Sequence, residues 1–295
     1  MDADKGDTVQ QKVALIGIGT MGIGMGGQLL KAGFPLAVYN RTAQRAQELV
    51  SQGAAPVNSP AEAAANADVI IAIVSDDAAS RHVWLDANGA LSTAKPNTVV
   101  IDCSTISPRW AREFAGAAQK RGCAPLDAPV TGSKSHAAAG ELVFLVGGDA
   151  ETLERVRPVL AVMSRRIVHM GPNGSGALMK LLNNFLAAVQ AASLGEAIAL
   201  IERSGLNRDA ALDILYNGAP GSPLIKTVGA RMTTRNYDVN FFLNLMEKDL
   251  NYASAEAREH GMELRTAAAA LSLFEEARKR GWGDKDFSAV VEGAR

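Results

Sequence analysis

The amino-acid sequence predicts an α/β protein, in which a doubly wound parallel sheet is followed by an all-helical domain and a long helix joins the two. In the first half, near-continuous apolar runs alternate with segments of helical composition, which is typical of strands buried on both faces by crossover helices. A glycine-rich turn at 17–22 directly follows the first apolar run. From Gly176 onward every periodic segment is helical, so we expect the domain boundary between 172 and 173.

Composition and charge argue against several kinds of partner. The formal net charge of −1 gives no overall attraction to nucleic acid or to an anionic membrane. The longest apolar stretch, 177–201, is interrupted by polar residues, so we expect no membrane span, and the polar residues 1–12 predict a flexible tail rather than a signal peptide. The two cysteines and four scattered histidines have no metal-ligand spacing and predict no metal site. We therefore expect a cytoplasmic protein in a reducing compartment.

The first strand and the turn after it have the pattern of a dinucleotide-binding site. Residues 13–16 are apolar and largely β-branched, and a helix-compatible segment at 25–32 follows the turn. In such a turn the first glycine allows a tight bend, the second lets the backbone approach a pyrophosphate, and the third lets the helix lie close to the strand. We therefore predict a Rossmann domain over 13–172. The expected cofactor contacts in its turn are Gly17, Gly19, Thr20, Met21 and Gly22.

The end of the second strand, at 36–39, indicates which dinucleotide is bound. An NAD site usually places Asp or Glu about 20 residues after the glycines, where the carboxylate holds the ribose hydroxyls. This chain has Asn40, Arg41 and Thr42 instead. Asn and Thr can donate hydrogen bonds to a 2′-phosphate, and Arg adds charge and a planar fork, so we predict NADP(H) rather than NAD(H). The alternative is that Arg41 is only a solvated surface residue.

Ligands bind such sheets at the carboxyl ends of the strands. The apolar runs at 69–74 and 98–102 lead into loops at this edge, where we expect Val74 and Ser75 to contact the cofactor. A third loop, at 127–134, offers hydroxyls and backbone N–H groups to a carboxylate. The other elements expected in this domain are helices at 43–51, 61–67 and 150–164 and strands at 142–146 and 166–169.

A long helix over 177–202 carries a lone lysine within an apolar run. The charge of such a lysine must reach water, a partner or a ligand. Lys180 and Asn184 are four residues apart and share one helix face, which we expect to meet a cleft. The alternative is a lysine that only extends to water.

The same helix is rich in small residues, such as Ala191 and Gly195, that let a second helix approach closely. The second helix could belong to the same domain, to a partner subunit, or to both, and we expect a homodimer or homotetramer. The remaining helices are expected at 209–216, 243–259, 266–280 and 287–292, with a loop at 218–223 between the first two.

With these features together, the chain resembles the β-hydroxyacid dehydrogenase family, which includes 3-hydroxyisobutyrate dehydrogenases and glyoxylate/succinic semialdehyde reductases. The resemblance extends over 13–292 and rests on four motifs. They are the glycine turn, Asp-Ala-Pro-Val-Thr-Gly at 127–132, Gly-Ala-Leu-Met-Lys-Leu-Leu-Asn-Asn at 176–184, and Lys-Asp at 248–249. The loop at 131–134 reads Thr-Gly-Ser-Lys where many members have Ser-Gly-Gly. That loop and the closing segment at 283–290 look more like the semialdehyde-reductase branch.

The resemblance implies a role for individual residues. Lys180 would be the catalytic residue, Lys248 would reach the cofactor, and Thr105 would lie near the nicotinamide and the substrate. The residues implied to contact the substrate are Thr105, Thr131, Gly132, Ser133, Asn184, Phe241 and Asp249. The helical domain, 173–295, would supply the wall of the substrate pocket and the contacts between subunits.

These expectations combine into the NADPH-dependent reduction of a small carboxylate-bearing aldehyde or keto acid, such as glyoxylate or succinic semialdehyde. The Lys180 ammonium would bind the carbonyl oxygen and donate the proton as the general acid. Three alternatives stay open. They are a 3-hydroxyisobutyrate dehydrogenase that works oxidatively, an imine reductase, in which this lysine is generally replaced, and a non-catalytic NADP-binding scaffold.

Overall fold

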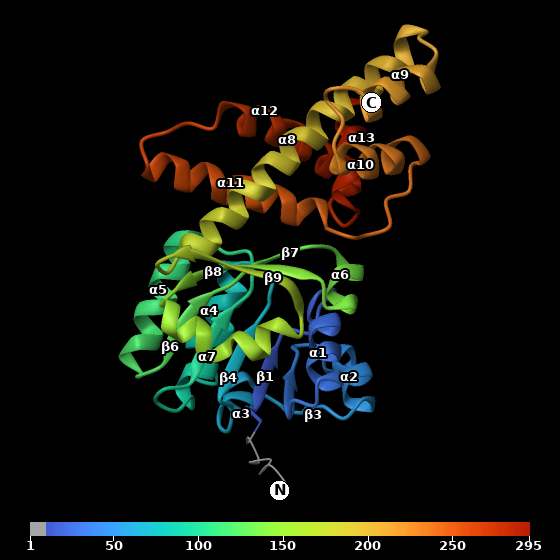
Figure 1. Ribbon diagram of the computed structural model, residues 1–295. Helices are drawn as coiled ribbons and strands as arrows, with labels where there is room; N and C mark the ends of the chain where they lie inside the picture. The colour runs from blue at the N-terminus through green and yellow to red at the C-terminus, as the bar shows by residue number, and fades with distance from the viewer. Residues whose placement is uncertain (1–9) are drawn as a thin grey trace, which may run out of the picture. The chain divides into compact units, whose positions relative to one another are not determined.

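The computed structural model describes residues 10–295 and divides into two compact units, one that ends at Ala177 and one that runs from Leu178 to Arg295 (Figure 1). The predicted tail at 1–12 lies outside the described residues except for its last three. Gln10 donates a hydrogen bond to the carbonyl of Ala32, and the backbone N–H of Lys12 donates to the carboxylate of Asp68.

The first unit is built on one mixed sheet. Its strands, over the described residues, are β1 (Val13–Ile16), β2 (Leu36–Tyr39), β3 (Ala55–Pro56), β4 (Val69–Ala72), β5 (Val99–Asp102), β6 (Ala124–Asp127), β7 (Val130–Thr131), β8 (Leu142–Gly148) and β9 (Ser164–Gly171). Their order is β3-β2-β1-β4-β5-β6-β8-β7, and β9 pairs with β8. The connection reverses between β1 and β4, which is where a doubly wound sheet binds its ligand.

The expectation of an all-parallel sheet is wrong at one edge. The first six strands pair in parallel, but β8 runs antiparallel to both β6 and β7. Residues 132–141, with the short α6 (Lys134–Ala139) among them, join β7 to β8, and a parallel return needs a crossover of a dozen or more residues, which this connection is too short to supply. An apolar run predicts a buried strand but not its direction, so the sequence could not show this.

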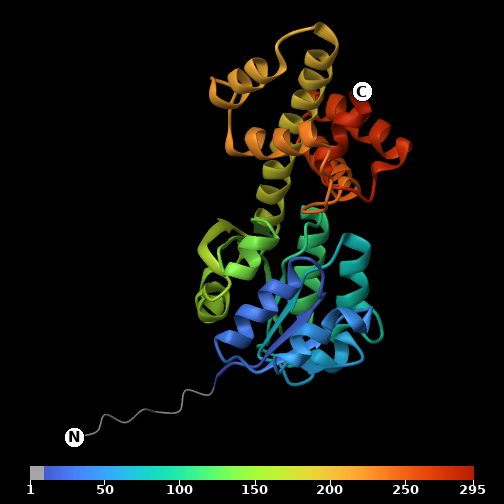
Figure 2. The same ribbon diagram turned by 90° about the vertical axis from the view of Figure 1, so that its right-hand side faces the viewer.

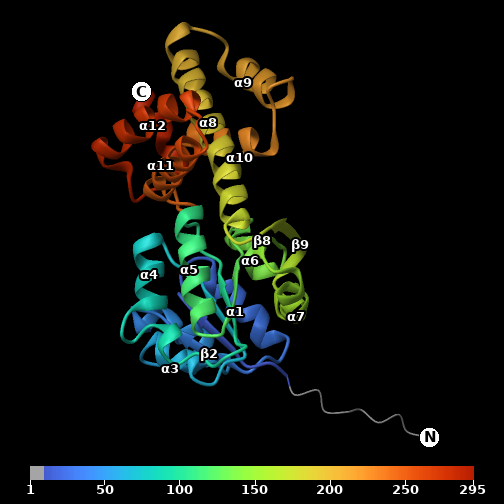
Figure 3. The same cartoon turned by 90° about the vertical axis from the view of Figure 1, so that its left-hand side faces the viewer.

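Alternating residues of the strands divide the core into two layers. The helices that cover the sheet are α1 (Gly22–Lys31), α2 (Gln47–Ser51), α3 (Pro60–Ala64), α4 (Asp77–Leu85), α5 (Pro108–Lys120), α6 (Lys134–Ala139) and α7 (Ala150–Ala161). Leu15, Val38 and Ile71 pack with α1, α2, α6 and α7 on one face of the sheet, whereas Ile16 and Ile70 pack with α3, α4 and α5 on the other (Figure 3). The α/β class is confirmed.

The second unit is helical, as predicted. Its elements are α8 (Ser175–Ser204, which begins in the first unit), α9 (Arg208–Asn217), α10 (Pro223–Thr234), α11 (Leu243–Glu259), α12 (Arg265–Ala277), a π turn (Arg278–Trp282), a 3-10 turn (Phe287–Val290) and α13 (Val291–Ala294). Figure 2 shows the orange and red helices of this unit lying alongside the yellow α8. Residues of α8 such as Leu194 and Ile198 share a buried core with Leu250 and Phe274.

Two predictions about these helices need correction. No helix was predicted between 218 and 242, but α10 begins at Pro223. Proline suits the first helical turn, and the Ser222 side chain accepts a hydrogen bond from the N–H of Ile225. The predicted helix at 266–280 ends at Ala277 and gives way to the π turn, in which Gly281 has a φ of 91°.

The expectation of no membrane span stays a prediction, and α8 is the helix on which it depends. Among the described residues it is the one helix that is long and apolar enough to cross a membrane, by length and composition alone. Half of its most apolar stretch of 18 residues is buried inside the protein.

Candidate active site

The three glycines of the phosphate turn each meet a different steric demand. Gly17 has a φ of +97°, and a Cβ there would lie 2.1 Å from the carbonyl oxygen of Ile73. A Cβ at Gly22 would lie 2.1 Å from the carbonyl oxygen of Gly17. Around Gly19, in contrast, no described atom would come within 4 Å of an added Cβ, so the backbone is open there. The turn leads into α1, whose N-terminus favours an anion, and it fits the pyrophosphate of a dinucleotide.

Asn40 at the end of β2 ties this turn to the next strand. Its side-chain oxygen accepts a hydrogen bond from the N–H of Ile18 at 2.9 Å, and its amide nitrogen donates to the carbonyl of Thr42 at 2.8 Å. Asn40 was predicted to donate to a phosphate, and these two bonds show that it also fixes the conformation of the turn. Arg41 and Thr42 are exposed, with their polar groups at the surface.

A buried carboxylate that the sequence analysis missed holds the loops after β4 and β5. Asp102 accepts hydrogen bonds from the N–H of Ser104 and from the indole of Trp84, both at 2.8 Å. The Ser104 hydroxyl in turn accepts a hydrogen bond from the N–H of Val74 at 2.8 Å. Burial raises the pKa of Asp102, although its hydrogen bonds oppose that shift. The network fixes Val74, and it places Thr105 next to the fixed Ser104.

The predicted carboxylate-binding loop is organised by a histidine. Thr131 ends β7, and Ser133 stands just before α6. The ring Nδ1 of His136 accepts a hydrogen bond from the N–H of Ser133 at 3.1 Å and lies 2.7 Å from its hydroxyl. In residues 10–295 the hydroxyl of Thr131 has no hydrogen-bond partner, and it remains available to a ligand. Gly132 between them adopts a φ of +131°.

A second missed carboxylate anchors the start of α8. Asp127, at the end of β6, is buried, and its two carboxylate oxygens accept hydrogen bonds from the N–H groups of Gly174 at 2.7 Å and Ala177 at 2.8 Å. Ala177 lies in the first turn of α8 and Gly174 directly precedes the helix, where backbone N–H groups otherwise lack partners. Burial raises the pKa of Asp127 to about 6 despite these bonds. The Asp at position 127 therefore fixes where the helix that carries Lys180 begins.

Within the second unit, Asn184, Lys248 and Asp249 form a polar cluster. The amide of Asn184 donates to a carboxylate oxygen of Asp249 at 2.6 Å, and the Lys248 ammonium lies 2.7 Å from the other carboxylate oxygen. Asp249 is fully buried, so its charge needs these partners. The Lys248 ammonium also lies 4.6 Å from the centre of the Tyr252 ring.

Lys180 is electrostatically coupled to this cluster. Loss of hydration lowers the pKa of Lys180 from 10.5 to about 8, with the Asp249 charge acting against that shift and the Lys248 charge adding to it. Within the described residues the Lys180 ammonium makes no hydrogen bond or ion pair, so its donors remain available. A lysine that can lose or gain a proton near neutral pH is suited to acid–base chemistry.

Phe241 is positioned by a third buried carboxylate. Asp286 accepts a hydrogen bond from the N–H of Phe241 at 3.2 Å and pairs with the guanidinium of Arg231 at 3.2 Å. The Phe241 ring packs edge-on against Phe287, with 6.2 Å between ring centres. The closing segment at 283–290 therefore holds the loop before α11.

Residues 10–295 contain no group of three or more His, Cys, Asp or Glu side chains that could hold a metal ion.

Comparisons with known proteins agree with both halves of this description. Residues 12–171 match the family model of the NAD-binding domain of 6-phosphogluconate dehydrogenase, and residues 174–293 match that of the NAD-binding domain of NADP-dependent 3-hydroxyisobutyrate dehydrogenase. An NAD-dependent L-serine dehydrogenase from Pseudomonas aeruginosa is 39% identical over 95% of this chain and 96% of its own. Glyoxylate/succinic semialdehyde reductase 1 from Arabidopsis thaliana is 36% identical over 96% of this chain and 98% of its own.

A solved structure is similar over the same length. The 3-hydroxyisobutyrate dehydrogenase of Mycobacterium tuberculosis with L-serine has a TM-score of 0.88 and 32% identity, and the match covers 97% of this chain and 100% of that one. Relatives above 30% identity along nearly the whole length share a family as well as a fold. This chain therefore belongs to the NAD(P)-dependent β-hydroxyacid dehydrogenase family.

Proposed function

We propose that this protein uses NADPH to reduce a small carboxylate-bearing aldehyde or keto acid, with glyoxylate and succinic semialdehyde as the expected substrates. The observation that carries this proposal is Lys180, whose ammonium has a pKa of about 8 and no partner among the described residues. An acid with such a pKa can hold its proton near neutral pH and still give it up in the reaction.

Lys180 would donate a hydrogen bond to the carbonyl oxygen and then transfer its proton to the developing alkoxide. Asp249 keeps enough negative charge nearby to favour the ammonium, and Asn184 holds Asp249 in place. In the reverse direction the neutral amine of Lys180 would take the proton from a hydroxyl group. When bound, the nicotinamide supplies or accepts the hydride.

The substrate carboxylate would be held by Thr131, Gly132 and Ser133. The unpartnered hydroxyl of Thr131 supports this assignment, and His136 supports it by keeping the Ser133 backbone in one conformation. The other residues that we assign to the substrate are Thr105, Asn184, Phe241 and Asp249.

The first unit would bind NADP(H) rather than NAD(H). The exposed Arg41 and Thr42 can donate to a 2′-phosphate, and no carboxylate stands at 40–42 to repel it. The other residues that we assign to the cofactor are Gly17, Gly19, Thr20, Met21, Gly22, Asn40, Val74, Ser75, Thr105 and Lys248.

Oxidation of a 3-hydroxy acid is a second candidate function. The L-serine dehydrogenase and the 3-hydroxyisobutyrate dehydrogenase with L-serine both favour it, since L-serine carries a carboxylate and a hydroxyl group. The same lysine would then act as the base. This reading also allows NAD, which the Pseudomonas relative is named for.

A panel of substrates run in both directions separates these functions. We expect NADPH oxidation, followed by its absorbance, to be fastest with glyoxylate or succinic semialdehyde, and slower with NADH. Faster turnover of L-serine or 3-hydroxyisobutyrate with NAD or NADP would establish the oxidative function instead. A cyclic imine serves as a control for imine reduction, and a protein that turned over none of these would contradict the proposal.

The pH dependence of the two directions should be opposite. Reduction needs the Lys180 ammonium, so kcat/KM for glyoxylate should be level below about pH 8 and fall above it, because the pKa of Lys180 is lowered to about 8. Oxidation needs the neutral amine and should rise through the same pH. Initial rates from pH 6 to pH 10 in one mixed buffer test this, and profiles with the same slope in both directions would contradict the role of Lys180.

We further propose that the protein is a cytoplasmic homodimer or homotetramer. The exposed Leu182, Leu186 and Leu200 of α8 support self-association, because a partner subunit that packed on this helix would bury their apolar surface.

A further inference from the structure

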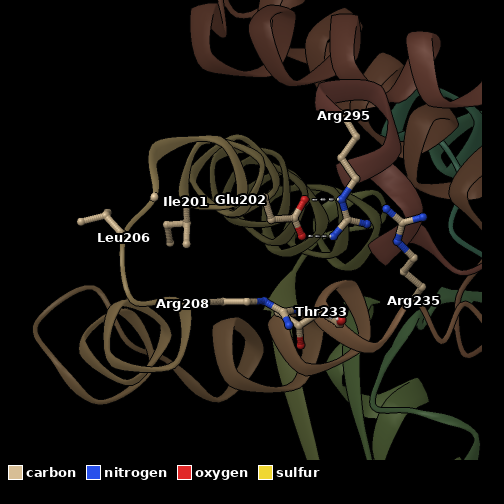
Figure 4. Close-up of a pocket in the computed structure, with 8 residues that line it drawn as sticks. Ile201, Glu202, Leu206, Arg208, Thr233, Arg235 and Arg295 are labelled. Atoms are coloured by element: carbon tan, nitrogen blue, oxygen red, sulfur yellow. Dashed lines mark hydrogen bonds and ion pairs between the residues drawn. The ribbon is translucent and has the colours of Figure 1, made fainter.

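The second unit contains a pocket of about 440 Å³ at the C-terminal end of α8, and most of its polar groups are cationic (Figure 4). Its lining residues are Ile201, Glu202, Gly205, Leu206, Arg208, Thr233, Arg235 and Arg295. The pocket is separate from the proposed catalytic group, since Lys180 and Glu202 are about 33 Å apart along the axis of the same helix.

The one acidic side chain of this lining is already neutralised. Arg295 binds both carboxylate oxygens of Glu202, at 2.6 and 2.9 Å, in the two-pronged geometry that suits a guanidinium. Arg295 also donates to Glu292 at 2.6 Å and to the hydroxyl of Tyr237 at 3.1 Å. The side chain of Arg295 is only 10% exposed, so these contacts hold its guanidinium group in one position at the base of the pocket.

Two further guanidinium groups remain without a carboxylate of their own. Arg208 donates one hydrogen bond, to the carbonyl of Thr233 at 2.9 Å. In the described part of the chain, Arg235 makes no hydrogen bond or ion pair. Both charges act on Glu202, whose pKa lies below its usual range first because of the hydrogen bonds from Arg295 and also because of Arg208 and Arg235. The three guanidinium groups therefore converge on one place and leave it with an excess of positive charge.

The backbone holds both of these arginines in defined positions. Arg235 ends α10 in the left-handed conformation, with a φ of 52°. Arg208 is the first residue of α9, directly after Asn207, whose side chain accepts a hydrogen bond from the N–H of Ala210. In Figure 4 the guanidinium group of Arg235 lies beside that of Arg295, and the guanidinium group of Arg208 lies below the carboxylate of Glu202, next to Thr233.

We propose that this pocket binds a small polyanion with two or more carboxylate or phosphate groups. A guanidinium group binds either kind of anion through paired N–H donors. A single exposed ion pair contributes little, so Arg208 and Arg235 must act together, which requires at least two anionic groups on one ligand. Leu206, which is 60% exposed, and Ile201 offer apolar contact to the body of such a molecule.

Titration calorimetry with citrate and with pyrophosphate tests this proposal and distinguishes the two anion types. NADP is kept saturating, so that the phosphate turn of the first unit is filled. We expect saturable binding of at least one of these anions, with a Kd below about 1 mM at low salt and much weaker binding at high salt. Acetate, with one carboxylate, should not bind.

Three variants make the result specific. Arg208→Gln and Arg235→Asn should each weaken binding by about tenfold or more, which corresponds to about 1.4 kcal/mol. Asn is chosen at 235 because it tolerates the left-handed conformation. Arg265→Gln is the matched control, since Arg265 is also the first residue of a helix and its side chain is 89% exposed, and it should bind as the wild type does.

Reductase activity without added anion should be unchanged in all three variants, which shows that they are folded. Absence of saturable binding by both anions, or equal affinity in the wild type, Arg208→Gln and Arg235→Asn, would overturn the proposal.

Discussion

Replacement of Lys180 by alanine is expected to lower kcat for carbonyl reduction by about 10²–10⁴-fold, the usual effect of removing a positioned acid. The alanine variant loses both the proton and the charge that stabilises the developing alkoxide. The affinity for NADPH should change little, because the glycine turn and Arg41 belong to the first unit. Steady-state kinetics with glyoxylate, together with NADPH binding by fluorescence, separates the two effects.

Two further variants show whether the loss arises from chemistry. Lys180→Met keeps most of the side-chain volume and should be as inactive as Lys180→Ala. Lys226→Ala, on the exposed surface of α10, removes a lysine from the same unit and should keep wild-type kcat. A folded Lys180→Met enzyme with near wild-type kcat would exclude Lys180 as the general acid.

Several strands and helices, and the glycine turn, could be predicted from local sequence. β1 and β2 have the predicted bounds, and α11 matches its predicted range of 243–259. The steric roles assigned to Gly17, Gly19 and Gly22 follow from a turn whose geometry depends on a few neighbouring residues. Local patterns of this kind determine local conformation, so the sequence was informative there.

The buried carboxylates could not be predicted, because their partners are distant in sequence. Asp127 binds N–H groups of residues 174 and 177, and Asp286 binds those of 240 and 241. Asp102 was expected only as the last residue of a strand, yet it connects three segments through Ser104 and Trp84. A signal was present, since an acidic residue at the end of an apolar strand must be paired when it is buried. The sequence did not show which groups these carboxylates pair with.

These carboxylates have a common structural task. Each is almost fully buried and accepts backbone N–H groups of a loop or helix start that leads to a proposed site residue. A backbone N–H buried without a partner is costly, so one acceptor with two oxygens can select a single loop conformation. The sites are thus held by charges that do not themselves take part in the proposed chemistry.

The substitution Gly176→Ala is expected to lower the free energy of unfolding of the first unit by about 3 kcal/mol or more, at the upper end for overpacking. A Cβ at this position would lie 2.2 Å from the carbonyl oxygen of Leu145, 2.7 Å from that of Asp127, and 2.9 Å from the N–H nitrogen of Gly147. All three contacts are backbone atoms of the sheet, which cannot rotate away as a side chain could. Urea denaturation followed by tryptophan fluorescence reports on this unit through the buried Trp84 and Trp110, and Trp282 contributes the signal of the second unit.

Gly116→Ala provides the matched control, because Gly116 also lies in a helix of the first unit and no described atom would come within 4 Å of its Cβ. Alanine there should stabilise the helix by about 0.5–1 kcal/mol, since glycine is the poorer helix former. If Gly176→Ala unfolded at the wild-type urea concentration, the close approach of α8 to β8 would be wrong. If Gly176→Ala unfolds at a lower urea concentration than the wild type, we also expect reduced reductase activity at urea concentrations where the variant is still folded. The added methyl group would displace the helix start that Asp127 holds, and Lys180 follows one turn later on the same helix.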